Sequence, residues 1–400
     1  MIVARALKVS SYRWVCVGAA LFSSSCVIEV NTEPRLAPPT EEEIWEQHFN
    51  DIVDDFNAGA QLFAEDVGVM SGAGARFFWV SAGLQLHSYD VLSTSRVDYE
   101  LPLTPDVYPE LAFGADTVVT AERSSGDWQI SAYAAAEPSA LIDTITWAAE
   151  GDGLDPDISL RAPISIDGGG VYLLDPKNVI HRWRPGMGAP EPLFSLADRG
   201  LMLGQVPRFS VHGDDVLVLD EAAPGSNFGE GGVLWHVRLS EGVAEQVATS
   251  ASEVSFHAGT AVYRVWDDED AEPTIFRFSS SDGRTEDLTA LLREARVEVE
   301  GLAIDPERLR YNTLVECQPG GITFASELGL FFFDPDKGEA EALLLQKGFN
   351  GDTDIFTTPI YSGVVLVEHV AFLGMHTCTI GGPAPGCKQP AIYMRDLSAH

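Results

Sequence analysis

The sequence predicts an all-β protein built from repeated four-stranded units, and three observations lead to this prediction. Residues 162–196 read as four short strands, ISID, VYLLD, VIHRWR and PLFSL, separated by a glycine turn, DPKN and PGMG. A similar pattern recurs on both sides of this stretch. The 37 Gly and 23 Pro suit a chain that turns often, and a hydrophobic content of 45% is ample for a core.

The repeat becomes visible when the second strands of successive units are aligned. Their starting positions recur at intervals close to the length of one propeller blade, about 40–50 residues, with one longer interval before Leu330. Within that interval Leu288, Leu291 and Leu292 have helical spacing. We therefore expect a helical insertion between the fifth and sixth units. The seven starting positions are Arg76, Thr117, Val171, Val216, Ala261, Leu330 and Val364.

Residues 61–400 are therefore predicted to form a β-propeller of about seven four-stranded blades, with six or eight as alternatives. The segments GVYLLDPKN at 170–178 and GLFFFDPDK at 329–337 are the most similar pair of repeats. With its pattern of strand, turn, VYLLD and turn, the body loosely resembles NHL-type propellers. The resemblance is generic, because the tryptophan-aspartate and kelch signatures are absent. The last unit has no evident fourth strand. We expect Gln61–Ala64 to supply it and to close the ring, since closure removes exposed sheet edges.

Residues 1–25 have the features of an export signal. Three basic residues precede the short apolar run WVCVGAALF, and small residues lead to Cys26. This ending resembles the lipobox of bacterial lipoproteins, which implies acylation of Cys26, although Ser23 stands where a Leu is usual. Ordinary signal cleavage near Ser25 is the alternative. Both interpretations predict an extracytoplasmic protein, either an outer-membrane lipoprotein or a periplasmic or secreted one.

Two segments are expected between the signal and the propeller. Residues 26–40 are polar and rich in proline, which is typical of a flexible tether. Thr40 and Glu43 then form a capping-box pattern, and an apolar face that includes Phe49, Val53 and Phe56 follows at helical spacing. We expect an N-terminal amphipathic helix within 41–60 that packs on the propeller.

Three cysteines remain after Cys16 and Cys26. Cys378 and Cys387 flank TIGGPAPG, a sequence suited to a tight loop, so we expect a disulfide between them in an oxidising compartment. Cys317 is then a buried free thiol, because no neighbouring His pattern would make it a nucleophile.

The formal net charge of −35 narrows the possible partners. Such an excess of acidic residues repels nucleic acid and anionic membrane surfaces, and it favours cations or basic partners. No nucleic acid is expected as a partner, and membrane contact is expected through the lipid anchor only.

The innermost strands of the third, fourth and fifth units carry matching polar residues. Alternation along a strand places all six on one side. Two hypotheses follow: a metal or other ligand at the mouth of the channel, or hydrogen bonds that tie neighbouring blades together, which we favour. The six residues are Asp167, His212 and His257, with Ser165, Ser210 and Ser255 two positions earlier in each strand.

Other candidate sites are weaker. Asn350, Asp352 and Asp354 have the spacing that begins a calcium loop, but Ile355 and Tyr361 replace residues that an EF-hand needs. No cofactor is expected, although calcium or another divalent metal stays an alternative. GxSxG, HExxH, P-loop and dinucleotide-binding motifs are absent. Most tryptophans lie in predicted strands, where core packing is expected rather than a ligand platform.

The sequence favours a non-catalytic, surface-anchored propeller that binds a protein, peptide or glycan partner in the cell envelope. One alternative is a metal-dependent hydrolase or lactonase that uses Asp167, His212 and His257 at the channel mouth. Another is a structural envelope component without a small ligand. The fold alone does not choose among them.

Overall fold

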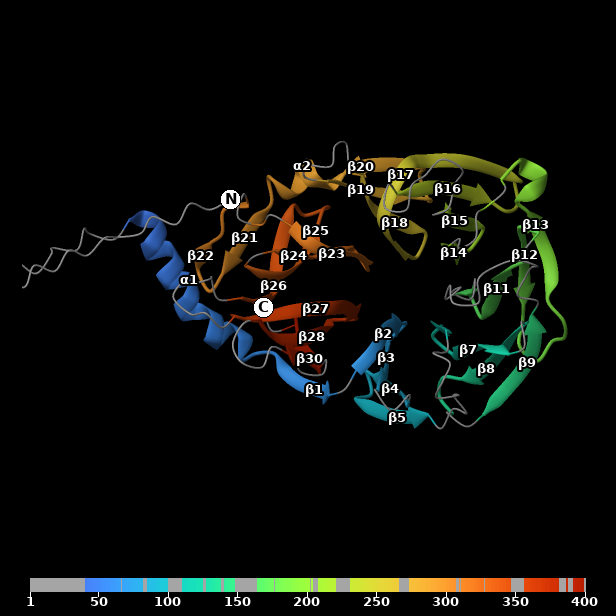
Figure 1. Cartoon of the computed structure of the whole chain (residues 1–400), viewed down its shortest axis with the longest axis horizontal. Coiled ribbons are helices and arrows are strands. Elements are labelled where there is room, and N and C mark those ends of the chain that lie inside the picture. Colours follow the sequence, from blue (N-terminus) through green and yellow to red (C-terminus); the bar gives the residue numbers. More distant parts are fainter. Residues whose placement is uncertain are drawn as a thin grey trace, which may run out of the picture. The chain divides into compact units, whose positions relative to one another are not determined.

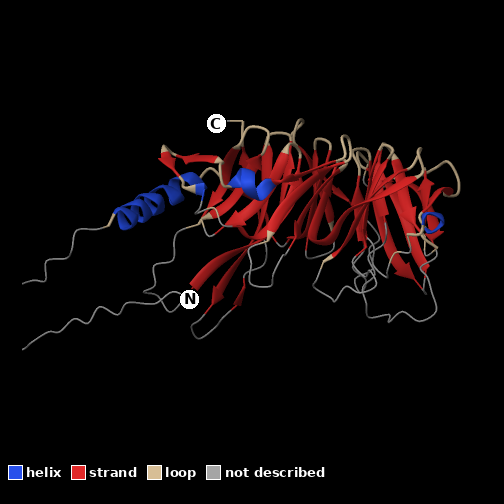
Figure 2. Cartoon of the chain, turned by 90° about the horizontal axis from the view of Figure 1, so that it is seen from above, coloured by secondary structure: helices blue, strands red, loops and turns tan. Residues whose placement is uncertain are grey.

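The computed structural model describes residues 40–65, 67–81, 85–99, 110–124, 127–137, 140–147, 164–175, 177–201, 203, 208–220, 231–265, 273–306, 309, 311–326, 328–346, 356–380, 386–387 and 391–398. The export signal, Cys26, the tether and the candidate calcium loop at 350–354 lie outside these residues. Antiparallel strands dominate the described chain, as Figure 2 shows.

Helix α1 (Glu41–Asn57) begins at the predicted capping box. The backbone N–H of Thr40 donates to Glu43 Oε2 at 2.7 Å, and the N–H of Glu43 donates to Thr40 Oγ1 at 3.2 Å. These bonds satisfy backbone N–H groups that a helix start leaves without partners. The beginning of the helix therefore follows directly from the local sequence.

The apolar face of α1 is buried from Phe49 to Phe56. Phe49 and Val53 are 1% and 3% exposed and belong to the same hydrophobic cluster as Phe331. At the end of the helix the Arg395 guanidinium lies 3.7 Å from the centre of the Phe56 ring and donates to the Phe56 carbonyl at 3.0 Å. The helix is thus packed on the β-structure, as its amphipathic pattern predicts.

Three four-stranded antiparallel sheets follow one another, each with its strands in chain order. Gly168 and Gly169 join two of these strands with φ angles of 54° and 73°, the conformation that a two-residue hairpin turn requires. The first sheet contains β2 (Val67–Ala73), β3 (Arg76–Ser81), β4 (Leu86–Asp90) and β5 (Ser95–Tyr99). The second contains β6 (Glu110–Phe113), β7 (Thr117–Ser124), β8 (Asp127–Ala134) and β9 (Leu141–Trp147). The third contains β10 (Ile164–Asp167), β11 (Gly170–Leu174), β12 (Val179–Trp183) and β13 (Glu191–Ser195), followed by the short 3₁₀ helix Ala197–Arg199.

The next sheet has seven strands because one long strand, β17 (Val243–His257), belongs to two successive units. Its first part pairs with β16, and Ser252–His257 pairs with β18. Glu253, with a φ of 48°, lies where the pairing changes partner. The other strands are β14 (Arg208–His212), β15 (Asp215–Asp220), β16 (Gly232–Arg238), β18 (Thr260–Val265), β19 (Thr274–Ser279) and β20 (Arg284–Asp287).

Helix α2 (Leu288–Leu292) follows β20, and the Asp287 carboxylate caps it by accepting from the N–H groups of Thr289 and Ala290. The six-stranded sheet after it has the order β22-β21-β26-β25-β24-β23, with β21 parallel to β26. Its strands are β21 (Arg296–Val299), β22 (Leu302–Ala303), β23 (Tyr311–Gln318), β24 (Gly321–Ser326), β25 (Gly329–Asp334) and β26 (Glu339–Leu345).

The last sheet joins the beginning of the β-structure to its end. Strand β1 (Gln61–Glu65) pairs with β30 (Ala391–Asp396), with Gln61 opposite Met394. The prediction that a segment around Gln61–Ala64 adds a strand to the last unit is confirmed by this pairing. The sheet order is β1-β30-β28-β27, with β27 (Phe356–Val367), β28 (Val370–Ile380) and the short β29 (Gly386–Cys387) on β28.

Two of the seven aligned positions are wrong. Leu330 lies in β25, which is the third strand from β23, and Val364 lies in the first strand of its unit, β27. The second strand of the sixth unit is β24, GITFAS, in which every residue is buried although the sequence is small and partly polar. Strand β25 is as apolar as a second strand, so hydrophobicity alone does not reveal its place.

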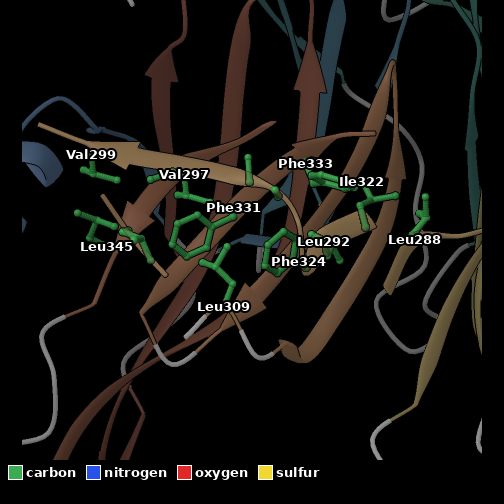
Figure 3. Packing of buried hydrophobic residues seen from close by; sticks show 14 of the residues in the cluster. Leu288, Leu292, Val297, Val299, Leu309, Ile322, Phe324, Phe331, Phe333 and Leu345 are labelled. Atoms are coloured by element: carbon green, nitrogen blue, oxygen red, sulfur yellow. The ribbon is translucent and has the colours of Figure 1, made fainter. Parts of the chain in front are cut away.

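Hydrophobic clusters join the successive units. Phe77 of β3 stacks on Phe372 of β28 with ring centres 3.8 Å apart, which links the first sheet to the last. Strand β27 also lies next to β2, and β23 lies next to both β17 and β27 (Figure 1). Figure 3 shows part of the cluster to which residues of α1 and α2 belong, including Phe324, Phe331 and Phe333 with Leu288 and Leu292 of α2. The first strands of four units are thereby held next to one another.

Candidate ligand-binding cavity

Polar side chains on first strands bind the backbone of the next unit. Ser165 Oγ accepts from the N–H of Val211 at 2.9 Å, and Asp167 Oδ2 accepts from the N–H of Gly213 at 2.9 Å. Both bonds run from β10 to the β14 hairpin. They satisfy backbone groups that face the neighbouring unit.

The same relationship recurs between β17 and β23, and between β23 and β27. Ser255 Oγ accepts from the N–H of Cys317 at 3.0 Å. Glu316 Oε2 accepts from the N–H of Val364 at 3.0 Å. Gln318 Oε1 accepts from the N–H of Leu366 at 3.1 Å. For Ser210, the described residues show no bond of this kind.

Strand register explains why these residues correspond. Asp167, His212 and His257 each occupy the last paired position of a first strand, opposite Gly170, Asp215 and Thr260. Gln318 has the same position opposite Gly321. Glu316 therefore stands where the three preceding units have Ser165, Ser210 and Ser255. Sequence alignment missed Glu316 and Gln318 because it assigned the second strand of this unit to LFFFD.

The three residues first considered for a metal site are neighbours, but they are not arranged as a metal-binding group. His212 Nδ1 lies 3.4 Å from Asp167 Oδ1, and the His212 side chain is 52% exposed. A Cβ built on Gly259 would lie 3.2 Å from His212 Cδ2, so this imidazole rests against the turn that follows His257. Within the described residues, no group of three or more His, Cys, Asp or Glu side chains is arranged to hold a metal ion.

A cavity of about 580 Å³ lies among the first strands β2, β17, β23 and β27. His257 and Ser255 line it, whereas Asp167 and His212 do not. Val69, although apolar, is 51% exposed and forms part of the wall. The lining residues are Val69–Gly72 of β2, Ser255–His257 of β17, Glu316–Gln318 of β23 with Pro319 after it, and Gly363–Leu366 of β27.

Glu316 is the acidic residue of this lining. Burial raises the pKa of its carboxyl to about 7, and the hydrogen bond from Val364 opposes that rise only in part. Among the residues that the structure describes, no Lys, Arg or His forms an ion pair with Glu316. Gly363 keeps the space beside it open, since a Cβ there would lie 3.1 Å from Met70 Cε and 3.7 Å from Glu316 Oε1.

The neighbouring titratable groups are held in neutral forms. Burial lowers the pKa of His257, and the charge of His212 lowers it further. Burial also raises the pKa of the Cys317 thiol to about 12, against smaller opposite effects of Arg277 and the His257 backbone. Cys317 is therefore a buried free thiol, as predicted, and a poor nucleophile.

Gln318 has a structural role at the edge of the cavity. Its Nε2 donates to the Val364 carbonyl at 2.8 Å while its Oε1 accepts from Leu366, and the residue is 8% exposed. Both ends of the amide are thus occupied by β27. This leaves the Glu316 carboxyl as the group at this edge with capacity for a ligand.

Three histidines that the sequence analysis did not single out pair with aspartates outside the cavity lining. His87 lies 2.6 Å from Asp98, His181 lies 3.0 Å from Asp175, and His236 lies 2.6 Å from Asp215. All three histidines belong to third strands, β4, β12 and β16. Because these His–Asp pairs recur at the same strand of these three units, they indicate a structural role within single units.

The backbone register places Cys378 of β28 opposite Cys387 of β29. Their side chains lie outside the part of the chain that is described, so the disulfide between them stays a prediction. No helix in the described residues is long and apolar enough to cross a membrane.

No protein-family model matches the sequence, and no curated protein matches it. Solved structures do match in fold. A structure from an analysis of two prolyl endopeptidases has a TM-score of 0.50 and 12% identity, over 88% of this chain and 55% of that one. The β-propeller domain of the Trilobed protease from Pyrococcus furiosus has a TM-score of 0.45 and 8% identity, over 81% and 97%. YCF48 bound to D1 peptide has a TM-score of 0.46 and 10% identity, over 84% and 95%. At these identities the matches concern the fold alone, and the successive antiparallel sheets of the described residues agree with the β-propeller that the sequence predicts.

Proposed function

We propose that this protein is a non-catalytic β-propeller that binds a peptide segment of a partner protein in the cavity between β2, β17, β23 and β27. The observation that carries the proposal is the cavity itself. Its volume of about 580 Å³ falls in the range of about 300–1,000 Å³ that ligand sites occupy. Val69, Met70 and Val365 contribute apolar side chains to its wall, whereas polar groups make up most of the exposed lining surface.

The nature of the wall favours a peptide over a glycan. Sugar sites usually offer an exposed aromatic face, and the aromatic residue in this lining is Phe256. Of the tryptophans considered as a platform, Trp79, Trp128 and Trp183 are 1%, 6% and 0% exposed and Trp147 and Trp235 are half-buried, and none of these five lines the cavity. Val69, Met70 and Val365 supply aliphatic surface that suits the side chains of a peptide.

The polar residues of the cavity support binding rather than catalysis. Ser255 Oγ is engaged by the Cys317 N–H, and the Cys317 thiol ionises only near pH 12. A nucleophile needs a base that activates it, and the hydrogen bonds of Ser255 and Cys317 run to the backbone instead. A metal-dependent hydrolase built on Asp167, His212 and His257 is not favoured, because within the described residues they form no group arranged to hold a metal ion and the first two lie outside the cavity lining.

The proposal extends to the blades and the compartment. The sheet order supports seven four-stranded blades, with β17 shared by the fourth and fifth and α2 as an insertion between the fifth and sixth. The N-terminal sequence supports export, with a lipid anchor at Cys26 or cleavage near Ser25. Together, the proposed fold and the proposed export signal describe a peptide-binding propeller at the cell envelope.

A pair of matched variants tests the site. Val69→Trp places a large ring on an exposed wall residue of the cavity, whereas Leu92→Trp makes a comparable change at a residue that is 68% exposed and outside the lining. Peptides selected from a random display library on the wild-type protein are then titrated against both. We expect the Val69→Trp protein to lose binding by about tenfold or more and the Leu92→Trp protein to keep it. Equal binding by both variants would place the partner elsewhere.

A further inference from the structure

The position of Glu316 poses a chemical question, because a carboxylate is not needed for the hydrogen bond that it makes. At the equivalent positions Ser165 and Ser255 accept the neighbouring backbone N–H with a neutral hydroxyl, at 2.9 and 3.0 Å. Glu316 makes the corresponding bond with an ionisable group that must be partly removed from water. Desolvating a carboxylate is costly unless another charge compensates it.

The described chain does not supply that compensating charge. The lining segments of β2 and β27 carry no titratable side chain, β17 contributes His257, and β23 contributes Cys317 besides Glu316 itself. Burial keeps both of these neighbours neutral near pH 7. Gln318 is committed to the backbone of β27. The described residues therefore place no positive charge opposite Glu316, and a bound molecule can supply one.

The surroundings of the carboxyl match an amphipathic cation. The Val364 N–H donates to Glu316 Oε2, while Glu316 Oε1 lies on the side of Gly363 and the end of the Met70 side chain. Val69 and Val365 add apolar wall to the same cavity. Lysine and arginine combine a charged end with an aliphatic stem that packs against such surface. The formal net charge of −35 also draws basic segments toward the protein.

We propose that Glu316 is the anionic subsite of the cavity and that it pairs with a lysine or arginine side chain of the bound peptide. This inference rests on the proposed peptide-binding function and specifies which peptides are accepted. The aliphatic stem of the basic residue lies along the wall formed by β2 and β27, and its charged end replaces the water that the carboxyl loses. Ser255 and Gln318 hold the strands on either side in place.

Proton linkage gives the subsite a measurable signature. Because the cation pairs with the ionised carboxyl, affinity rises with pH until Glu316 is fully ionised. With a pKa of about 7, affinity increases about tenfold between pH 6 and pH 8 and then stays constant until the ligand amine loses its proton near pH 10. Protonation of His257 at low pH acts in the same direction, so a His257→Gln protein is titrated in parallel.

The probes are three blocked tripeptides, acetyl-Ala-Xaa-Ala-amide, in which Xaa is lysine, norleucine or glutamate. Calorimetric titrations compare the wild-type protein with Glu316→Gln, Glu316→Ser and Asp167→Asn. The serine variant copies the residue of the equivalent positions and keeps a hydroxyl for the Val364 N–H. Asp167 is the matched control, because it also accepts a backbone N–H from the next unit but lies outside the cavity lining. Melting curves check that every variant is folded.

We expect the wild-type protein and Asp167→Asn to bind the lysine peptide about tenfold or more tightly than the norleucine peptide at pH 8, and to bind the glutamate peptide least. Both Glu316 variants lose this preference and its pH dependence, while His257→Gln measures the part of that pH dependence that protonation of His257 adds. Equal affinity for lysine and norleucine, with both lost in Val69→Trp, would overturn the cation subsite while the peptide-binding function stands. Absence of binding by all three peptides would contradict both proposals.

Discussion

Glu316 Oε2 accepts a hydrogen bond from the backbone N–H of Val364 at 3.0 Å, across the boundary between two neighbouring sheets. This bond places a carboxyl between β23 and β27 in the wall of a cavity. The three units before it carry serine at this position, and Ser165 and Ser255 make the corresponding bond, so the bond recurs while the carboxyl replaces a hydroxyl in this unit.

The first prediction concerns the pH dependence of stability. Burial in the folded protein raises the pKa of the Glu316 carboxyl from its ordinary value of 4.5 to about 7. Between these values the folded chain binds more protons than the unfolded chain, so the free energy of unfolding falls as the pH rises, by at most about 3 kcal/mol. Glu316→Gln removes this contribution. Urea unfolding at pH 5 and pH 8 should show a smaller loss for the variant, and equal losses would argue against a desolvated carboxyl.

The second prediction concerns the bonds between units. Ser165→Ala removes the acceptor for the Val211 N–H, and Val211 is 4% exposed. A buried N–H without a partner costs about 1–3 kcal/mol, so the urea midpoint should fall accordingly. Ser93→Ala is the control, because the Ser93 hydroxyl bonds to Ser95 in an exposed turn. Similar midpoints for the two variants would mean that the Ser165 bond adds little to stability.

The third prediction concerns β1. Deleting residues 57–66 removes the strand that pairs with β30 and also Phe63, whose ring contacts Trp79 and Phe372. The last sheet would then expose an edge and part of its core. We expect the truncated protein to lose cooperative unfolding in circular dichroism and calorimetry. A sharp transition at the wild-type temperature would show that β1 is dispensable.

The fourth prediction concerns the N-terminus. If Cys26 is acylated, the wild-type protein expressed with its export signal sediments with membranes, and Cys26→Ala releases it into the soluble fraction. Mass spectrometry of the mature N-terminus provides the control, since cleavage near Ser25 without a lipid gives the unmodified mass. Unchanged membrane association of Cys26→Ala would refute acylation at this residue.

Much of the fold was predictable because the first five units repeat the same hairpin. Five of the predicted starting positions lie in observed second strands, namely β3, β7, β11, β15 and β18. These positions are Arg76, Thr117, Val171, Val216 and Ala261. The turn residues and the apolar runs agree in these units. The register that aligned Ser165 with Ser210 and Ser255 follows from the same hairpins.

The sixth unit was misassigned for a physical reason. The sequence of β25 is as apolar as that of a second strand, because β25 is buried on both faces. The sequence of β24 contains small and polar residues and therefore does not indicate that this strand is completely buried. Glu316 was therefore never aligned with the serines. The closeness of β2 to β27 also depends on contacts between the two ends of the chain, which no local pattern contains.

The most direct test of the account is the affinity of the lysine tripeptide for the wild-type and Glu316→Gln proteins, measured by calorimetry at pH 6 and pH 8. The account predicts that the wild-type affinity rises about tenfold between the two values, while the variant binds weakly and equally at both. An unchanged pH dependence in Glu316→Gln would contradict the assignment of Glu316 as the group that recognises the ligand.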